Sequence, residues 1–174
     1  MVKKLPLSNS MAVLLIALVG MVSLATFRFS PVDLENLPDL SFQLLDGGSL
    51  STAELANRPA LITFWSTSCG PCLSEIPEMN RLYADYAGKG LQMLAVAMDY
   101  DSPEAVRETR DRLKLRYPLA TDTEARAVRA FGNVRVTPTH FLIGPNGSVL
   151  LRKIGRMDFD DLRTLIDQLL PNVG

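Results

Sequence analysis

Cys69 and Cys72 are the only two cysteines in the 174-residue chain, and the dipeptide Gly70-Pro71 separates them. This spacing brings the second sulfur within bonding reach of the first, so the pair can cycle between a dithiol and a disulfide. The apolar run 60–65 ends shortly before the pair, and a helical pattern follows it. A Cys-x-x-Cys pair at a turn from strand to helix is the context that a dithiol redox centre requires.

The order of the two sulfurs along the expected helix predicts different roles for them. Cys69, at the helix start, faces unpaired N–H groups and the positive end of the helix dipole, which favours its thiolate. Cys72 lies one turn into the helix, where we expect it to be shielded and to act as the resolving thiol. Haem attachment would need a histidine where Leu73 stands. The two cysteines could be half of a zinc site, but the chain has no second pair of cysteines to complete it. A plain structural disulfide is the remaining alternative.

The composition excludes several other classes of protein. His140 is the only histidine, so a zinc site can hardly be assembled, and any catalytic triad must use this residue. Lys and Arg (18) nearly balance Asp and Glu (19), which gives no sign of a nucleic-acid partner. Hydrophobic residues make up 47% of the chain, an ordinary globular proportion. We expect no metal and no cofactor.

The N-terminal segment has the pattern of a targeting sequence. Lys3 and Lys4 precede the uncharged apolar run Met11–Phe27. This pattern predicts a signal anchor or signal peptide over residues 1–27, and we favour an uncleaved anchor in the inner membrane over a soluble periplasmic protein. The lysines place the N-terminus in the cytoplasm and the rest of the chain on the extracytoplasmic side. We expect a linker over 28–38 and one domain over 39–174.

Strand and helix patterns alternate along this domain and predict an α/β fold with a mixed sheet covered by helices. A hairpin with a turn at Asp46-Gly47-Gly48 comes first, followed by a helical turn over 51–55. The expected strands are 60–65, 91–98, 117–121, 139–143 and 149–154, and the expected helices are 69–87, 103–115, 124–131 and 158–170. A basic cluster (Arg107, Arg110, Arg112, Lys114 and Arg116) is interpreted as a solvated helix face.

Three motifs in order along the chain carry a family resemblance: FWSTSCGPCLSEIP at 64–77, VTPTHFLI at 136–143 and GPNG at 144–147. Over about residues 36–171 the sequence resembles the thioredoxin superfamily, in particular the membrane-anchored thiol-disulfide oxidoreductases of the TlpA/ResA type. The resemblance implies a thioredoxin-like fold with an N-terminal β-hairpin. It also implies an inserted strand and helix between the active-site half and the cis-proline half.

The resemblance assigns roles to individual residues. Pro138 matches the cis-proline that lies against the active-site disulfide, and Thr137 offers its backbone to an extended substrate. Glu75 matches an acid that could take a proton from Cys72, since i and i+3 share a helix face. Trp65 matches the active-site tryptophan, which completes the expected site.

Three positions bear on this assignment. Thioredoxin buries an aspartate where this chain has Thr63, which makes Glu75 the better proton-handling candidate. Ser68 replaces the aromatic residue that is common just before the first cysteine. We interpret His140, two positions after the matched cis-proline, as a strand residue.

These features together predict a reductase of extracytoplasmic protein disulfides, with cytochrome c maturation as one setting. The resemblance implies a membrane-embedded thiol-electron donor as partner, and we expect a monomer. A thiol-disulfide oxidase or isomerase is an alternative, as is a non-catalytic thioredoxin-fold binding module. A thiol peroxidase is another, in which Ser66 fits the required pattern but Ile62 stands where proline is needed.

Overall fold

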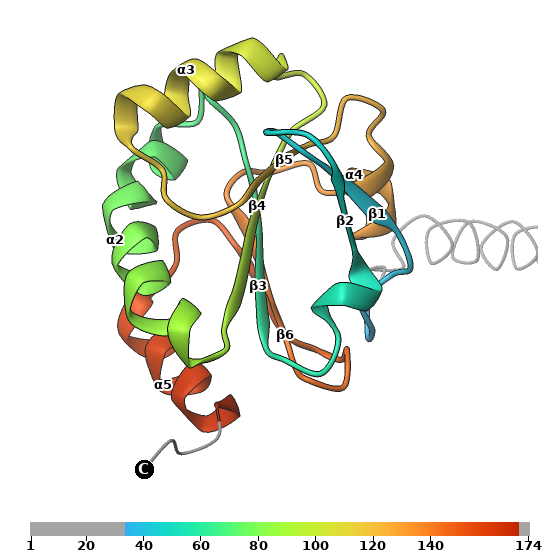
Figure 1. Cartoon of the computed structure of the whole chain (residues 1–174), viewed down its shortest axis with the longest axis vertical. Coiled ribbons are helices and arrows are strands. Elements are labelled where there is room, and N and C mark those ends of the chain that lie inside the picture. The colour runs from blue at the N-terminus through green and yellow to red at the C-terminus, as the bar shows by residue number, and fades with distance from the viewer. Residues whose placement is uncertain (1–33, 171–174) are drawn as a thin grey trace, which may run out of the picture. The chain divides into compact units, whose positions relative to one another are not determined.

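A seven-stranded mixed sheet forms the centre of the protein (Figure 1). The computed structural model describes residues 34–170, and the strand order is β2-β1-β5-β4-β3-β6-β7. β3, β4 and β5 run parallel, and the remaining neighbours pair antiparallel. The strands are β1 (Ser41–Leu44), β2 (Ser49–Ser51), β3 (Ala60–Trp65), β4 (Gln92–Ala97), β5 (Leu119–Thr121), β6 (Thr139–Ile143) and β7 (Val149–Ile154).

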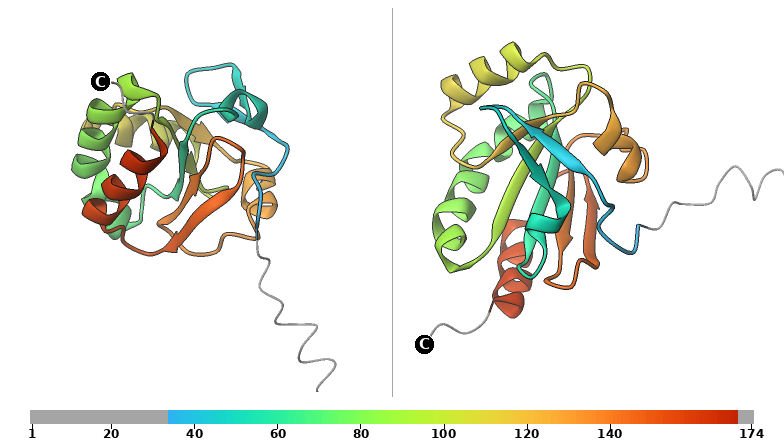
Figure 2. Two further views of the ribbon diagram at one scale, coloured as in Figure 1. Left: turned by 90° about the horizontal axis from the view of Figure 1, so that it is seen from below. Right: turned by 45° about the vertical axis from the view of Figure 1, so that its right-hand side comes forward.

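Helices cover both faces of the sheet. The helical elements are η1 (Thr52–Leu55), α2 (Gly70–Tyr86), η2 (Ala87–Lys89), α3 (Pro103–Leu113), α4 (Arg126–Ala130) and α5 (Phe159–Leu169). Side chains of α2, α3 and α5 pack into one apolar cluster, whereas η1 and α4 belong to a second cluster on the other face. α2 and α5 lie side by side (Figure 2), where Arg163 pairs with Asp85 at 3.1 Å.

The central strand β3 is buried along its whole length, which explains its continuous apolar sequence. Alternate residues of a strand point to opposite faces, so Leu61 and Trp65 join the cluster beneath α2 while Phe64 joins the other. Thr63 shares the α2 face with Leu61 and Trp65. Phe131 and Phe141 pack edge to face on the other side, with ring centroids 5.0 Å apart.

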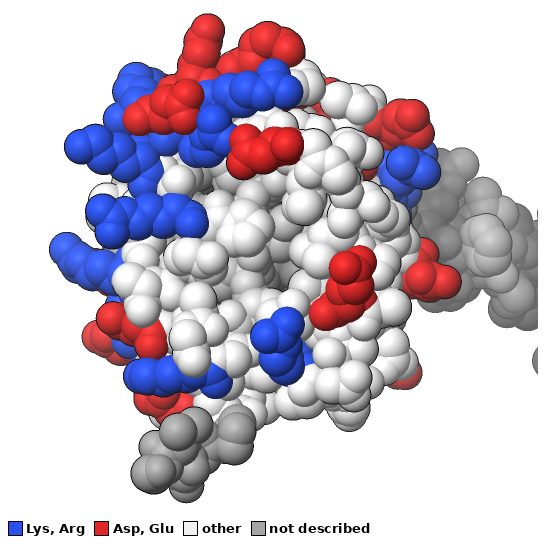
Figure 3. Space-filling view, in the orientation of Figure 1, with Lys and Arg blue, Asp and Glu red and all other residues white. Residues whose placement is uncertain are grey.

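The predicted α/β fold is confirmed, and the helix and strand bounds differ from those expected by only a few residues. The segment between β4 and β6 contains α3, β5 and α4, in the place of the expected insertion. The α4 helix is shorter than the expected 124–131, because Ala125 at its start has a left-handed backbone (φ 54°). The basic cluster lies on the α3 side of the molecule, where Lys and Arg side chains gather (Figure 3). Arg107 in it pairs with Glu104 at 3.3 Å.

The N-terminal expectations fall mostly outside the described residues. The segment 1–27 and the linker as far as residue 33 are not covered, and within residues 34–170 no helix has the length and apolar character to cross a membrane. Residues 34–38 differ from a free linker, because the Leu37 N–H donates to Gly147 at 2.8 Å and Val149 donates to Glu35 at 2.9 Å. Leu34 and Leu37 pack on the second apolar cluster, which ties this segment to the domain.

Candidate active site

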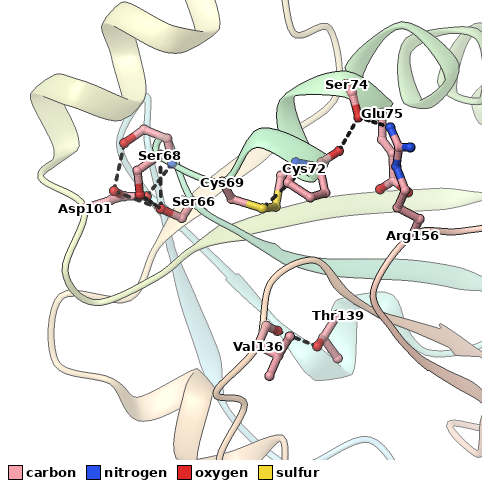
Figure 4. Close-up of a disulfide and its surroundings, with 12 residues drawn as sticks. Ser66, Ser68, Cys69, Cys72, Ser74, Glu75, Asp101, Val136, Thr139 and Arg156 are labelled. Carbon is pink, nitrogen blue, oxygen red and sulfur yellow. Dashed lines mark hydrogen bonds between the residues drawn. A yellow bond between two sulfur atoms is a disulfide. The ribbon is translucent and has the colours of Figure 1, made fainter.

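The Cys-x-x-Cys pair lies where β3 passes into α2 (Figure 4). Cys69 caps the helix: its sulfur accepts the Cys72 N–H at 3.2 Å, and its carbonyl accepts the Leu73 N–H at 3.0 Å. Gly70 and Pro71 form the exposed first turn, and proline suits this position because its missing N–H would have no helical partner. The cap places Cys69 at the positive end of the α2 dipole, as the sequence predicted.

The two sulfurs are bonded to each other but differ in exposure. The S–S distance is 2.04 Å. Cys69 is partly exposed, whereas Cys72 is only 5% exposed. An incoming disulfide can therefore reach Cys69 far more readily than Cys72, which agrees with the order of roles expected from the helix.

Asp101 holds the loop that leads into the pair, a contact that the sequence analysis did not identify. Its carboxylate accepts the Thr67 N–H and the Thr67 hydroxyl, both at 2.8 Å. The Ser66 hydroxyl lies 3.4 Å from the same carboxylate and 3.0 Å from the Ser68 hydroxyl (Figure 4). Because β3 and β4 are parallel, their carboxyl ends meet at one edge of the sheet, and an acid just after β4 was the available signal.

Glu75 is buried beneath the pair at 7% exposure, one helical turn beyond Cys72. Its Oε1 accepts the N–H of Met157, in the loop between β7 and α5, at 2.7 Å. Its Oε2 lies 3.3 Å from Nε2 of His140, a distance within ion-pair range although the ring N–H is not aligned as a regular hydrogen bond. Glu75, the acid that the resemblance singled out, is therefore not a surface residue, because both of its carboxylate oxygens face other protein groups.

His140 occupies β6 as predicted, but its side chain contacts were not anticipated. The residue is fully buried, and its Nδ1 lies 3.0 Å from the hydroxyl of Thr63, its register partner on β3. The position that lacks thioredoxin's aspartate thus contacts a histidine, which in turn approaches Glu75. Sequence alternation places His140 on one face of a strand, but only the β3–β6 register shows which side chains it meets.

A small cavity lies between Thr63, Glu75 and the buried Cys72. It has a volume of about 10 Å³, near the lower limit for a single water molecule. Cavity-lining side chains come from every part of the site: Thr63, Trp65, Cys72, Glu75, Ile76, Met79, Ala95, Tyr117 and Pro138. Burial raises the pKa of the Tyr117 hydroxyl, and the nearby Glu75 carboxylate raises it further, so this phenol stays protonated.

The remaining predicted residues surround the pair. The Thr137–Pro138 peptide bond is cis, and Pro138 is buried at the cavity while Thr137 is half exposed. Trp65 is buried, and its indole nitrogen has no hydrogen-bond partner among the described residues. Val136, just before Thr137, exposes 51% of its surface. Among residues 34–170, no group of three His, Cys, Asp or Glu side chains could hold a metal ion.

This combination of a thioredoxin-like sheet, a capped Cys-x-x-Cys pair and an adjacent proline defines a thioredoxin-superfamily dithiol protein. A family model described as the AhpC/TSA family matches residues 34–152. The chain belongs to this family, and its relatives make it a ResA/TlpA-like member.

Individual relatives support the same assignment. The thiol-disulfide oxidoreductase ResA of Geobacillus kaustophilus is 31% identical over 134 residues, covering 77% of this chain and 76% of that protein. ResA of Geobacillus thermodenitrificans is 28% identical over 97% of this chain and 98% of its own length. A solved structure of a thiol:disulfide interchange protein of the thioredoxin family, from Chlorobium tepidum, has a TM-score of 0.71 at 25% identity. It covers 82% of this chain and 100% of its own. The predicted enzyme class, thiol-disulfide oxidoreductase, is confirmed.

Proposed function

We propose that this enzyme reduces disulfide bonds of exported proteins on the extracytoplasmic side of the inner membrane. The observation that carries the proposal is the arrangement of an accessible Cys69, a buried Cys72 and a buried carboxylate, Glu75, beside the second sulfur. A nucleophile that faces solvent can attack a large partner, and a shielded thiol with its own base can then release it. The Gly70-Pro71 dipeptide is also that of thioredoxin, which favours a reducing role.

The reaction proceeds in two exchanges. The Cys69 thiolate attacks one sulfur of the substrate disulfide, whose other sulfur leaves as a thiolate and takes a proton from water. Cys72 then gives its proton to Glu75 and attacks the Cys69 sulfur of the mixed disulfide. The second substrate sulfur leaves with the electron pair of the broken bond. The substrate has gained two electrons from the enzyme dithiol, which is now oxidised to the Cys69–Cys72 disulfide.

The chain needs a dithiol donor to return to its reduced state. A membrane-embedded thiol-electron carrier is the partner we propose, because the apolar run Met11–Phe27 and the preceding Lys3 and Lys4 support anchoring in the same membrane. Substrates in this compartment include apocytochrome c and other exported proteins with disulfides. Alkaline phosphatase fused after residue 40 should be active in cells, and an inactive fusion would refute the extracytoplasmic placement.

Reduction of insulin by the full-length chain with a small dithiol as donor tests the activity. Wild type should turn over, and Cys69→Ser should not. An absence of turnover by wild type would favour a binding module. Faster reactivation of scrambled ribonuclease than reduction of insulin would favour an isomerase. Because the AhpC/TSA match covers most of the domain, consumption of hydrogen peroxide should be measured beside it, and a faster peroxide reaction would identify a thiol peroxidase.

A further inference from the structure

Two buried titratable side chains, Glu75 and His140, face each other behind the resolving sulfur. We propose that His140 is a positioning residue that shares the proton of Glu75, so that the two side chains act as one base for Cys72. The inference rests on the proposed reductase function, because it concerns the step in which Cys72 loses its proton. It is carried by the geometry of the two side chains and of the groups that bind them.

The partners of the carboxylate direct one of its oxygens to the histidine. Oε1 of Glu75 is occupied by the Met157 N–H at 2.7 Å, a donor that cannot give up its proton. Oε2 is left to face Nε2 of His140 at 3.3 Å. The Glu75 side chain is 8% exposed and that of His140 is not exposed at all, so water competes little for either. A proton taken up on Oε2 therefore has the imidazole nitrogen as its neighbour.

The far side of the imidazole ring is also prepared for a change of charge. Nδ1 of His140 lies 3.0 Å from the Thr63 hydroxyl, which can either donate or accept a hydrogen bond. Nε2 can take up a proton only when the neutral ring carries its hydrogen on Nδ1, so the Thr63 hydroxyl accepts the Nδ1–H of the neutral ring and of the charged ring alike. Thr63 thus satisfies Nδ1 in both states of the ring, which an apolar residue at this position could not do.

Among the side chains that line the cavity with Cys72, Glu75 is the only one that carries a full charge at neutral pH. From β5 and the preceding loop, Tyr117 lines the same cavity, and its raised pKa keeps it neutral. In the loop between β7 and α5, Arg156 is exposed and donates to the Ser74 hydroxyl at 2.6 Å. Lys153, Asp158 and Asp161, on β7 and at the start of α5, are exposed and line a separate surface pocket. On α2, Cys72 is the one titratable side chain besides Glu75 among the residues that line the cavity.

The proton step can be written in full. Cys72 transfers its proton to Oε2 of Glu75 and becomes the thiolate that attacks the Cys69 sulfur. The same proton passes from Oε2 to Nε2 of His140, which leaves a carboxylate beside an imidazolium whose Nδ1–H donates to Thr63. The imidazolium offsets the negative charge of the carboxylate near the new thiolate. When Cys72 is next reduced to the thiol, the proton returns along the same path.

The test measures Cys72 directly and needs no protein substrate. In the full-length Cys69→Ser chain, the rate of Cys72 alkylation by iodoacetamide is followed from pH 5 to pH 10. His140→Gln retains an amide that can hydrogen-bond Glu75 but cannot take up a proton. We expect it to slow alkylation at pH 7 about tenfold, the effect of displacing one titration by one unit, and to remove one titration from the pH profile.

The choice of variants separates a shared proton from a purely structural role. In a Glu75→Gln background, His140→Gln should have no further effect, because residues that act as a unit are not additive. Thr63→Val removes the hydroxyl from the other side of the ring and should also slow the alkylation of Cys72. This variant replaces His140→Gln in the test if His140→Gln proves too unstable to purify. A profile of His140→Gln that superimposes on that of its parent, or full additivity with Glu75→Gln, would overturn the proposal.

The control measures the other sulfur. In the Cys72→Ser chain, alkylation of Cys69 should change less than twofold on introducing His140→Gln, because Cys69 does not line the cavity. Equal slowing of Cys69 and Cys72 would mean a general distortion and would also overturn the proposal. Failure of wild type to reduce insulin would instead refute the proposed function, so the two outcomes are distinguishable.

Discussion

Replacement of Glu75 by glutamine should abolish most of the reductase activity while leaving the fold nearly intact. The amide oxygen of the new side chain can still accept the Met157 N–H, which now lies 2.7 Å from Oε1. The amide nitrogen then faces His140, whose Nε2 can accept its N–H if Nδ1 carries the ring proton and donates to Thr63. Because the hydrogen bonds are re-formed, we expect the free energy of unfolding to fall by about 1 kcal/mol or less.

The loss of activity should be much larger than the loss of stability. General acid–base help contributes roughly 10²- to 10⁴-fold, or about 2.7–5.4 kcal/mol of barrier. Glu75 is 7% exposed, so water is a poor substitute for its carboxylate. We therefore expect Glu75→Gln to slow the resolving step by about 10²-fold or more.

The assay is single-turnover reduction of a model disulfide by the reduced full-length chain, measured across pH. The wild-type profile should need one more titration than that of the variant, with values that belong to the coupled set rather than to one group. Glu104→Gln is a matched control, because Glu104 is an exposed acid on α3, far along the chain from the cysteines, whose side chain pairs with Arg107. Rates of wild type and Glu75→Gln that agree within twofold at every pH would refute the assignment of Glu75 as the base for Cys72.

Three further changes follow from the same geometry. Cys72→Ser should accumulate mixed disulfides through Cys69 in cells, whereas Cys69→Ser should accumulate almost none, as seen on non-reducing gels; equal trapping would reverse their roles. Asp101→Asn, which replaces one of two carboxylate oxygens that each accept a bond from the loop, should lower the free energy of unfolding by about 1–3 kcal/mol in denaturant titrations, and an unchanged midpoint would contradict the loop contacts. Tyr117→Phe should reduce the loss of stability between pH 8 and pH 11, because the raised pKa keeps the folded phenol protonated while the unfolded one ionises near pH 10 and removes about 1.4 kcal/mol per pH unit above it. Tyr100→Phe, at a 63% exposed position, is the control, and an equal alkaline loss in wild type and Tyr117→Phe would contradict the effect of burial.

The elements were predictable from the sequence because their signals are local. Ser102 before Pro103 predicts the start of α3, and its hydroxyl accepts the Ala105 N–H at 3.2 Å. Gly90, after the end of α2 and η2, has a left-handed backbone (φ 111°) that glycine adopts without strain. The continuous apolar runs of β3 and β4 predict strands buried on both faces. Local patterns of this kind determine the helices and strands.

Spacing alone predicted the candidate site only where its residues are close in sequence, and Thr137 and Pro138 came from the family resemblance. Cys69, Cys72 and Glu75 lie on one helix, so their spacing alone indicates a shared face. Contacts of Asp101 with Thr67 span 34 residues, and the contact of His140 with Thr63 spans 77. Such contacts depend on strand order and register, which no local pattern contains.

The segment 34–38 differs from a linker for a similar reason. Its composition resembles that of a connecting stretch, with Glu35 and Asn36 between the leucines and Pro38 after them. Leu34 and Leu37 nevertheless find the second apolar cluster, and backbone bonds with the turn between β6 and β7 hold them there. The backbone partners, Gly147 and Val149, lie more than a hundred positions away, so the sequence of the segment alone could not indicate them.

The hydrogen bond that holds Oε1 of Glu75 to the Met157 N–H has a consequence for the newly made chain. Met157, which binds Oε1, lies 82 residues after the acid, whereas both cysteines precede Glu75 by six residues or fewer. During synthesis the dithiol is therefore complete long before β6 and the β7–α5 loop exist, and until they dock Glu75 faces water. Contacts across such long separations form late in folding because their loops are costly to close. The proposed base for the resolving thiol is thus in place only in the finished domain. The proposal therefore predicts that nascent or partly unfolded chains carry a dithiol that other disulfides can capture but that releases them slowly.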